Sequence, residues 1–257
     1  MTGNLPDQWG SPPEMWGLPE QSAHVWRVSL DRADDAARRL GGVCAPDERR
    51  RASQFRFARD GRRFIVGRGI LRLILARYLH IEPQSVEFVY GPYGKPSLAP
   101  AIPGPLIHFN VSHSAGVMLC ALTGAVNVGV DIERVRALAD YDRMIERMFS
   151  EREHSALQSL PTSEQLRAFF LCWAHKEAHL KATGVGLSGS LDQLETYATL
   201  VDEAPPRIEV ILQKRDLASW THLQLSPGSG FVAALAVEAR DYAVDCWEWP
   251  ESLESVP

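Results

Sequence analysis

The most regular alternation of hydrophobic and polar positions in this chain runs from residue 126 to residue 133. Four apolar residues alternate there with Asn127, Gly129, Asp131 and Glu133. Alternation with a period of two predicts a strand with one buried face. Weaker alternation or short apolar runs predict further strands at residues 24–30, 85–90, 107–111, 117–122, 207–213, 222–225 and 231–238.

Apolar residues at intervals of three and four predict the helices. One long helix is expected to begin at Asp60, a capping residue, and its pattern stops before Pro83. A second helical region covers residues 140–160, and a third helix runs from Ser163 to Gly184. Helix and strands therefore occur in the same order twice. This order predicts an α+β fold of two halves with a seam near residue 125.

The composition narrows the class of protein. The chain has 257 residues, 45% of them hydrophobic, which is enough for one large core or for two packed halves. We expect no membrane association, because no apolar run is long enough to span a bilayer and no signal-peptide pattern opens the chain. The four cysteines are scattered and form no Cys-x-x-Cys pair, so a reducing, cytoplasmic location is expected.

Charge is distributed unevenly along the chain. The net charge of -5 argues against bulk nucleic-acid binding. Residues 47–77 nevertheless contain ten arginines and only three acidic residues. A local anion site would explain this basic segment if Arg51 and Arg68 converge with Lys95 and His113 in three dimensions. A solvated helix face would explain it equally well.

Two carboxylates lie on the same face of the most regular predicted strand. Asp131 and Glu133 are two residues apart, so a strand places both side chains opposite its apolar face. Paired carboxylates repel each other unless a cation lies between them, and oxygen ligands favour Mg²⁺ over zinc. The alternative is an ordinary solvent-exposed strand end.

A second charged pair belongs to the third predicted helix. Glu177 and Lys181 are four residues apart and therefore share one stripe of that helix with Trp173. A surface ion pair would have the same spacing, but the apolar residues 169–173 indicate that the helix is partly buried. If Glu177 reached the same cation as the strand carboxylates, the site would suit a magnesium-bound diphosphate. The histidines at 175 and 179 do not have the glutamate position of a zinc protease motif, so zinc is not favoured.

Four short motifs occur in an order and spacing that resemble the Sfp-type phosphopantetheinyl transferases. They are Gly94-Lys95-Pro96, Asn110-Val111-Ser112-His113, Gly129-Val130-Asp131-Ile132-Glu133 and Trp173-Ala174-His175-Lys176-Glu177-Ala178-His179-Leu180-Lys181. The resemblance implies a pseudo-two-fold pair of similar halves, each an antiparallel sheet packed on a long helix, with the active site in the cleft between them. It implies a coenzyme A-binding half at residues 1–125 and a half with metal-binding carboxylates at residues 126–257.

The same resemblance implies an activity and a set of roles. The enzyme would transfer the 4'-phosphopantetheine group of coenzyme A to a serine of an apo acyl or peptidyl carrier protein, releasing adenosine 3',5'-bisphosphate. The implied Mg²⁺ ligands are Asp131, Glu133 and Glu177. Glu177 would also serve as general base, and Lys181 would contact the diphosphate. The implied contacts of the 3'-phosphoadenosine part are Arg51, Arg68, Lys95, Ser112 and His113, although Glu48 stands where some members carry a basic residue.

The resemblance further implies a monomer that binds neither nucleic acid nor membrane. Two alternatives use the same residues differently. One is a magnesium-dependent nucleotide diphosphate hydrolase or transferase, which would turn over nucleotides without a protein acceptor. The other is a non-catalytic carrier-protein-binding module that docks through its basic segment. Which carrier protein is served lies beyond what the sequence predicts.

Overall fold

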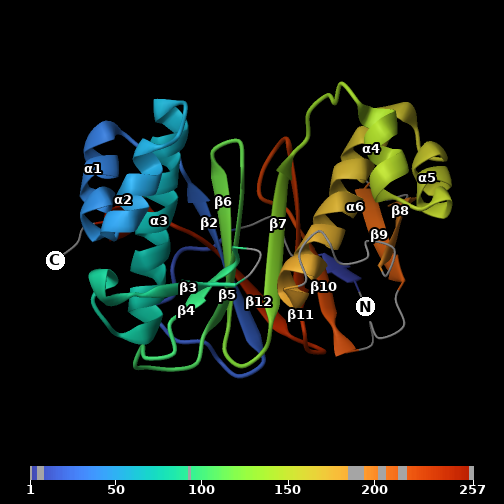
Figure 1. Cartoon of the computed structure of the whole chain (residues 1–257). Coiled ribbons are helices and arrows are strands. Elements are labelled where there is room, and N and C mark those ends of the chain that lie inside the picture. The colour runs from blue at the N-terminus through green and yellow to red at the C-terminus, as the bar shows by residue number, and fades with distance from the viewer. Residues whose placement is uncertain are drawn as a thin grey trace. The chain divides into compact units, whose positions relative to one another are not determined.

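The computed structural model describes residues 2–4, 9–91, 94–184, 194–201, 207–213 and 219–254. Its contacts group into two compact units (Figure 1). The N-terminal unit comprises residues 8–109, 113–125 and 243–257, and the C-terminal unit comprises residues 1–7, 110–112 and 126–242. Each chain end thus belongs to the unit built mainly from the other part of the chain. The predicted domains, 1–125 and 126–257, stay a prediction.

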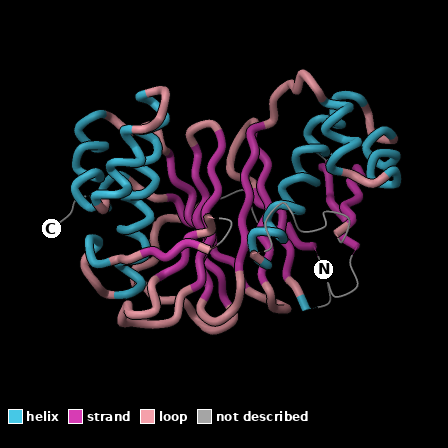
Figure 2. Tube along the Cα trace, viewed as in Figure 1, coloured by secondary structure: helices cyan, strands magenta, loops and turns pink. Residues whose placement is uncertain are grey.

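The N-terminal unit is a four-stranded sheet with helices. Its strands run in the order β12-β2-β6-β5, in which β2 pairs antiparallel with β6 and parallel with β12. Figure 2 shows the helices α1 to α3 gathered along one side of this sheet. The elements are β2 (Ser22–Ser29), α1 (Asp34–Val43), α2 (Pro46–Ser53), α3 (Ala58–Leu79), η1 (Pro83–Ser85), β3 (Phe88–Tyr90), β4 (Pro96–Leu98), β5 (His108–Ser114), β6 (Val117–Thr123), β12 (Ala243–Glu248) and η4 (Glu251–Glu254).

Small residues and aromatic rings explain how this unit packs. Gly69 of α3 lies so close to α1 that a Cβ atom there would come within 2.8 Å of the Leu40 carbonyl oxygen. Trp26 of β2 is fully buried, and Trp16 stacks on it with ring centroids 5.0 Å apart. Trp249, which follows β12, contacts the same two rings edge-on. Both ends of this unit's chain are therefore anchored on one aromatic cluster.

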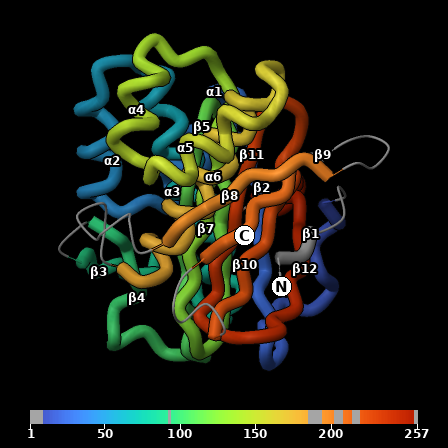
Figure 3. Tube along the Cα trace, turned by 90° about the vertical axis from the view of Figure 1, so that its right-hand side faces the viewer, coloured from blue at the N-terminus to red at the C-terminus, as the bar shows by residue number. Residues whose placement is uncertain are grey.

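The C-terminal unit contains a second four-stranded sheet, in the order β1-β10-β11-β7. The long helix α6 packs against β7 and β11, and a separate hairpin of β8 and β9 packs on α5 and α6 (Figure 3). The elements are β1 (Thr2–Asn4), β7 (Val128–Arg134), α4 (Tyr141–Met148), α5 (Glu151–Gln158), α6 (Thr162–Thr183), β8 (Glu195–Val201), β9 (Arg207–Gln213), β10 (Thr221–Leu225) and β11 (Phe231–Val237).

Most elements predicted from the sequence exist, and their ends show where local patterns were misleading. The α+β class is confirmed, and α6 ends at Gly184, whose φ of 74° is the left-handed conformation of a helix C-cap. Asp60 does not cap α3, since the helix already begins at Ala58. The predicted helical region 140–160 is two helices, because Ser150 starts a new one. The pseudo-two-fold relation stays a prediction.

Strands β1, β4, β8 and β12 had no counterpart among the predicted elements. No helix in the described part of the chain combines the length and the apolarity that a membrane span requires.

Candidate functional site

The candidate site is built on β7, where Asp131 is 4% exposed. Its Oδ1 atom accepts a hydrogen bond from Ser112 Oγ at 2.8 Å and an ion-paired hydrogen bond from Lys181 Nζ at 2.5 Å. Lys181 Nζ also donates to Ser112 Oγ at 3.0 Å. Residues from three distant parts of the sequence, the middle of β5, β7 and the last turn of α6, therefore meet at one carboxylate oxygen.

Glycine makes this meeting possible. A Cβ atom at Gly129 would lie 1.9 Å from the carbonyl oxygen of Ala178, so α6 rests directly on the backbone of β7. Alanines line the contact between α6 and β11 as well, as Ala174, Ala178 and Ala182 pack on Ala234 and Ala236. No bulky side chain separates the helix from the sheet. Lys181 therefore lies close enough to β7 to reach Asp131.

Asn110 fixes the neighbouring backbone. Its Oδ1 atom accepts a hydrogen bond from the Val130 amide at 3.0 Å, and Asn110 itself is buried. A buried amide side chain that bonds to a strand backbone sets the position of both. Asn110 thus fixes the backbone of β7 at Val130, the residue before Asp131.

Glu177 lies half-buried one turn before Lys181 on α6. Burial raises the pKa of Glu177 to about 7, the charge of Lys181 opposes this, and the charges of Asp131 and Glu133 reinforce it. The charges of Asp131, Glu133 and Lys181 thus all act on the Glu177 carboxyl group. We call Asp131, Glu133, Glu177 and Lys181 the carboxylate cluster.

Two oxygens of the carboxylate cluster remain unsatisfied. Asp131 Oδ2 and Glu177 Oε1 are both buried, and neither accepts a hydrogen bond from the described residues. Buried carboxylate oxygens without a donor are costly unless a cation compensates them. This donor set fits Mg²⁺, which binds oxygen ligands. Within the described ranges, however, no three His, Cys, Asp or Glu side chains are already arranged to hold a metal ion.

The structure gives Lys181 a partner that the helical spacing alone did not predict. Lys181 shares a stripe of α6 with Glu177, and its charge acts to lower the pKa of Glu177. Its Nζ atom also pairs with Asp131 at 2.5 Å. Ser112, which the family resemblance assigned to the nucleotide, lies beside Asp131 and Lys181, and its contact with the nucleotide stays a prediction. Glu133 is half-buried at the end of β7, on the same face as Asp131.

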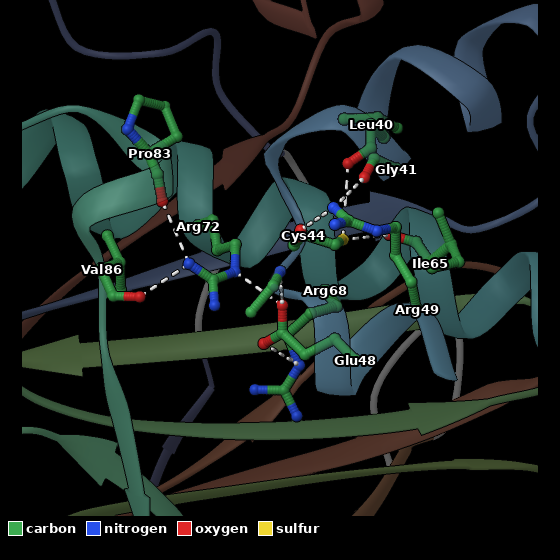
Figure 4. A network of polar contacts seen from close by, with 11 residues as sticks. Leu40, Gly41, Cys44, Glu48, Arg49, Ile65, Arg68, Arg72, Pro83 and Val86 are labelled. Atoms are coloured by element: carbon green, nitrogen blue, oxygen red, sulfur yellow. Dashed lines mark hydrogen bonds and ion pairs between the residues drawn. The ribbon is translucent and has the colours of Figure 1, made fainter. Parts of the chain in front are cut away.

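The basic segment of the N-terminal unit forms a different kind of network (Figure 4). Glu48 of α2 is 3% exposed and accepts hydrogen bonds from Arg72 Nε at 2.8 Å and from the Ala45 amide at 2.7 Å. Arg68 Nε lies 3.4 Å from the other oxygen of Glu48. Arg72 also donates to the carbonyl oxygens of Pro83 and Val86. Arg68 and Arg72 therefore help to hold the fold together.

Arg68 is enclosed by aromatic rings as well as by Glu48. Its guanidinium carbon lies 4.9 Å from the Phe88 ring centroid and 6.0 Å from that of Tyr90. Its Nη1 atom is buried and has no acceptor among the described residues. Arg68 and Arg72 share the single negative charge of Glu48, so the contact of Arg68 with a phosphate stays a prediction.

The remaining predicted nucleotide contacts lie nearer the surface. Arg51 is exposed, with its guanidinium carbon 5.4 Å from the Phe64 ring centroid. Lys95 is half-buried before β4, and burial lowers its pKa. His113 is exposed in β5.

A cavity of about 330 Å³ opens beside Glu48 and Arg72. Its lining carries three carboxylates and one guanidinium, a balance that disfavours a phosphate group. The lining residues are Ala45, Asp47, Glu48, Arg72, Gln84, Val86, Glu87, Phe88 and Tyr90.

Sequence reasoning missed a buried ion pair next to the carboxylate cluster. Lys176, the residue before Glu177, is 2% exposed and forms an ion pair with Glu153 of α5 at 2.8 Å. A signal for Glu153 was present, because it follows Ser150 by three residues in a capping box. Its partner could not be found in this way, since 23 residues separate the two.

Comparisons with known proteins agree on one class of enzyme. The family model described as 4'-phosphopantetheinyl transferase superfamily matches residues 127–243. The model described as 4'-phosphopantetheinyl transferase, N-terminal, matches residues 26–124.

Individual relatives extend this agreement. The chain is similar to 4'-phosphopantetheinyl transferase HetI of Nostoc sp., with 35% identity over 95% of this chain and 100% of the relative. It is 29% identical to 4'-phosphopantetheinyl transferase Sfp of Bacillus subtilis, over 65% of this chain and 73% of that protein. The human L-aminoadipate-semialdehyde dehydrogenase-phosphopantetheinyl transferase is 32% identical over 58% of this chain and 51% of its own length.

Proposed function

Because this chain belongs to the 4'-phosphopantetheinyl transferase superfamily, we propose that the carboxylate cluster carries the reaction of that family. The enzyme transfers 4'-phosphopantetheine from coenzyme A to a serine of an apo carrier protein and releases adenosine 3',5'-bisphosphate. The comparisons favour neither a nucleotide hydrolase nor a non-catalytic binding module.

One observation carries the assignment of the reacting groups. Asp131 is buried with one oxygen held by Ser112 and Lys181, while its other oxygen and one oxygen of Glu177 lack any donor in the described part of the chain. We propose Asp131, Glu133 and Glu177 as ligands of Mg²⁺. When bound, the ion would neutralise charge on the diphosphate of coenzyme A.

The protein's own groups then have distinct tasks. Lys181 supplies a fixed positive charge, and Ser112 orients it because its hydroxyl accepts from Nζ and donates to Asp131. A positioned cation stabilises the negative charge of a transferring phosphoryl group. Glu177, with its pKa raised to about 7, is suited to accept the proton of the carrier serine.

We propose that the nucleotide end of coenzyme A is bound through Arg51, Lys95 and His113. The exposure of Arg51 and His113 supports this, because both can reach a ligand from solvent. Arg68 belongs to the same proposal, because Glu48 is shared with Arg72 and Arg68 Nη1 has no acceptor among the described residues. The N-terminal part of the chain would thus bind the nucleotide, and the C-terminal part would supply the reacting groups.

The remaining expectations belong to the same proposal. Coenzyme A and carrier proteins are cytoplasmic, so we propose a cytoplasmic monomer that binds neither nucleic acid nor membrane. All four cysteines are free, which suits a reducing compartment.

The test is incubation with coenzyme A, Mg²⁺ and an apo carrier protein, followed by the intact mass of the carrier. Glu177→Gln should abolish the phosphopantetheinyl mass gain. The matched control is Glu238→Gln, since Glu238 is an exposed carboxylate of the same unit that accepts a hydrogen bond from the Asn127 side chain. Full transfer by Glu177→Gln, or no transfer by the wild type with any of several carriers, would contradict the proposal.

A further inference from the structure

The ion pair between Lys176 and Glu153 is a second polar centre of the C-terminal unit, and it lies outside the carboxylate cluster. Lys176 Nζ donates to Glu153 at 2.9 Å and to the Met148 carbonyl oxygen at 3.2 Å. It also lies 4.9 Å from the Phe149 ring centroid. The ammonium group is therefore held by α5 and by the residues just before it.

The carboxylate of Glu153 is saturated with donors. One oxygen accepts from the Thr196 amide at 2.7 Å and from the Thr196 hydroxyl at 2.8 Å. The other accepts from the Ser150 amide at 2.7 Å and from Lys176. Glu153 is 1% exposed. A carboxylate with a donor on every side has one position, so it links α5, α6 and β8 rigidly.

Stability alone does not explain such a centre. Burying two charges costs about as much as their attraction returns, and a hydrophobic pair of equal volume is often as stable. Apolar packing is non-directional and tolerates small rotations of a helix. Hydrogen bonds to a fixed carboxylate are directional, so they do not tolerate such rotations.

The position of Lys176 determines what this rigidity controls. Lys176 immediately precedes Glu177, which lies about 100° further around α6. The close approach at Gly129 fixes how near α6 lies to β7. The directional bonds of Lys176 to Glu153 and to the Met148 carbonyl oxygen also resist rotation about the helix axis. A rotation of about 10° would move a carboxylate carried about 5–6 Å from the axis by about 1 Å.

We propose that Lys176 and Glu153 are positioning residues that fix the rotation of α6 and so aim Glu177 at Asp131. The inference rests on the proposed function, because it assumes that Glu177 takes part in the transfer. A misplacement of about 1 Å can cost about a hundredfold in rate. The pair therefore acts on the rate through Glu177, without touching substrate.

The experiment replaces both partners with apolar residues. The double variant Lys176→Met/Glu153→Leu leaves no buried unpaired charge, so the fold should persist. Its Tm should fall, because Thr196 and Ser150 lose the acceptor of their hydrogen bonds. We expect kcat for phosphopantetheinyl transfer to fall about tenfold to a hundredfold, with KM for coenzyme A nearly unchanged. The Mg²⁺ concentration that gives half-maximal activity should rise, because one expected ligand is misaligned.

The N-terminal unit offers a matched control. Arg32 and Glu254 also form a buried pair, with Nε 2.9 Å from the carboxylate oxygen, and neither belongs to α6. Arg32→Met/Glu254→Leu should therefore change Tm without changing kcat or the Mg²⁺ dependence.

A milder variant covers the case in which the double variant fails to fold. Thr196→Val removes one donor to Glu153 and keeps the ion pair and the side-chain shape. We expect a loss of a few-fold in kcat at unchanged KM.

A folded double variant with wild-type kcat and Mg²⁺ dependence would overturn the proposal. So would unchanged kcat in Thr196→Val if the double variant does not fold. Asp131→Asn separates the two levels of the argument. If it retains transfer, the carboxylate cluster itself is misassigned, whereas loss of transfer there together with a wild-type double variant removes only the positioning role.

Discussion

The two units place a buried ion pair at the same point of their long helices. Helices α3 and α6 have 22 residues each, and Arg72 and Lys176 are both the fifteenth residue. Each cation pairs with a glutamate, Glu48 or Glu153, at the third position of a short helix. Each glutamate also accepts from the backbone amide of its helix N-cap at 2.7 Å.

The two long helices carry different residues just after these ion pairs, at their sixteenth and twentieth positions. The sixteenth and twentieth residues of α6 are Glu177 and Lys181, which belong to the carboxylate cluster. Their counterparts in α3 are Leu73, which is buried in the core, and Arg77, which donates to the Leu253 carbonyl oxygen at 3.0 Å. At matched positions, one unit thus carries the proposed reacting groups and the other carries structural ones.

This correspondence is what the predicted pseudo-two-fold relation would produce, and that relation stays a prediction. The ion pair does not require the carboxylate cluster, since one unit has the pair without the cluster. Exchanging residues at matched positions tests this distinction.

The largest difference in transfer activity is expected between variants at the twentieth residue of α6 and of α3. Lys181→Met should reduce transfer about a hundredfold to a thousandfold, because it removes the cation beside Asp131. Arg77→Met should leave transfer unchanged and lower Tm, since it loses the bond to Leu253 and contacts with Trp16 and Trp249. Steady-state kinetics and thermal unfolding separate these outcomes, and equal losses of transfer would remove the functional contrast.

The buried pairs themselves should respond alike in stability. Glu48→Gln and Glu153→Gln each leave a buried cation without its full counter-charge, which costs about 3–5 kcal/mol. Urea unfolding measures the free energy of each variant. A loss in only one variant would show that the resemblance between the pairs is geometric and not energetic.

Each long helix lies very close to a neighbouring element at a glycine, and replacing that glycine should have a smaller effect on stability. Gly129→Ala would drive a methyl group into the Ala178 carbonyl oxygen, and Gly69→Ala would meet that of Leu40. Overpacking of this kind costs about 1–3 kcal/mol. Only Gly129→Ala should also reduce transfer, because it displaces α6 from Asp131.

Gly42→Ala is the control for these glycine variants. It lies in α1 with nothing within 4 Å of an added Cβ atom, so it should stabilise the helix slightly. Destabilisation by Gly42→Ala would show that the other losses do not come from close approach.

The smallest expected effect concerns the caps of the short helices. Ser150 caps α5 through its side chain, whereas Ala45 has no oxygen with which to cap α2. Ser150→Ala should cost about 1 kcal/mol, and Ala45→Ser should stabilise the protein by a similar or smaller amount. Thermal unfolding of both variants checks the signs, and the same sign for both would contradict the comparison.

The sequence predicted the parts of the site that depend on local periodicity. A period of two placed Asp131 and Glu133 on one face of β7, and a helical period placed Glu177 and Lys181 on one stripe of α6. Local periodicity could not predict the contact between Lys181 and Asp131. It depends on α6 lying directly on β7 at Gly129, which is a tertiary feature.

Long-range pairs were missed for the same reason. Glu48 and Arg72 are 24 residues apart, and only the packing of α2 on α3 brings them together. The arginines of this segment looked alike in the sequence, yet Arg72 is buried and Arg51 is exposed. Strand β12 was also missed, because it forms by pairing with β2 from the opposite end of the chain.

The central claim is that the carboxylate cluster performs the transfer, and the most direct test is the intact mass of an apo carrier protein after incubation with coenzyme A and Mg²⁺. With the wild-type enzyme, the carrier should gain one phosphopantetheinyl group. With Asp131→Asn, which keeps the size of the side chain and removes its charge, the carrier should keep its apo mass at every Mg²⁺ concentration. A full mass gain with folded Asp131→Asn would contradict the account.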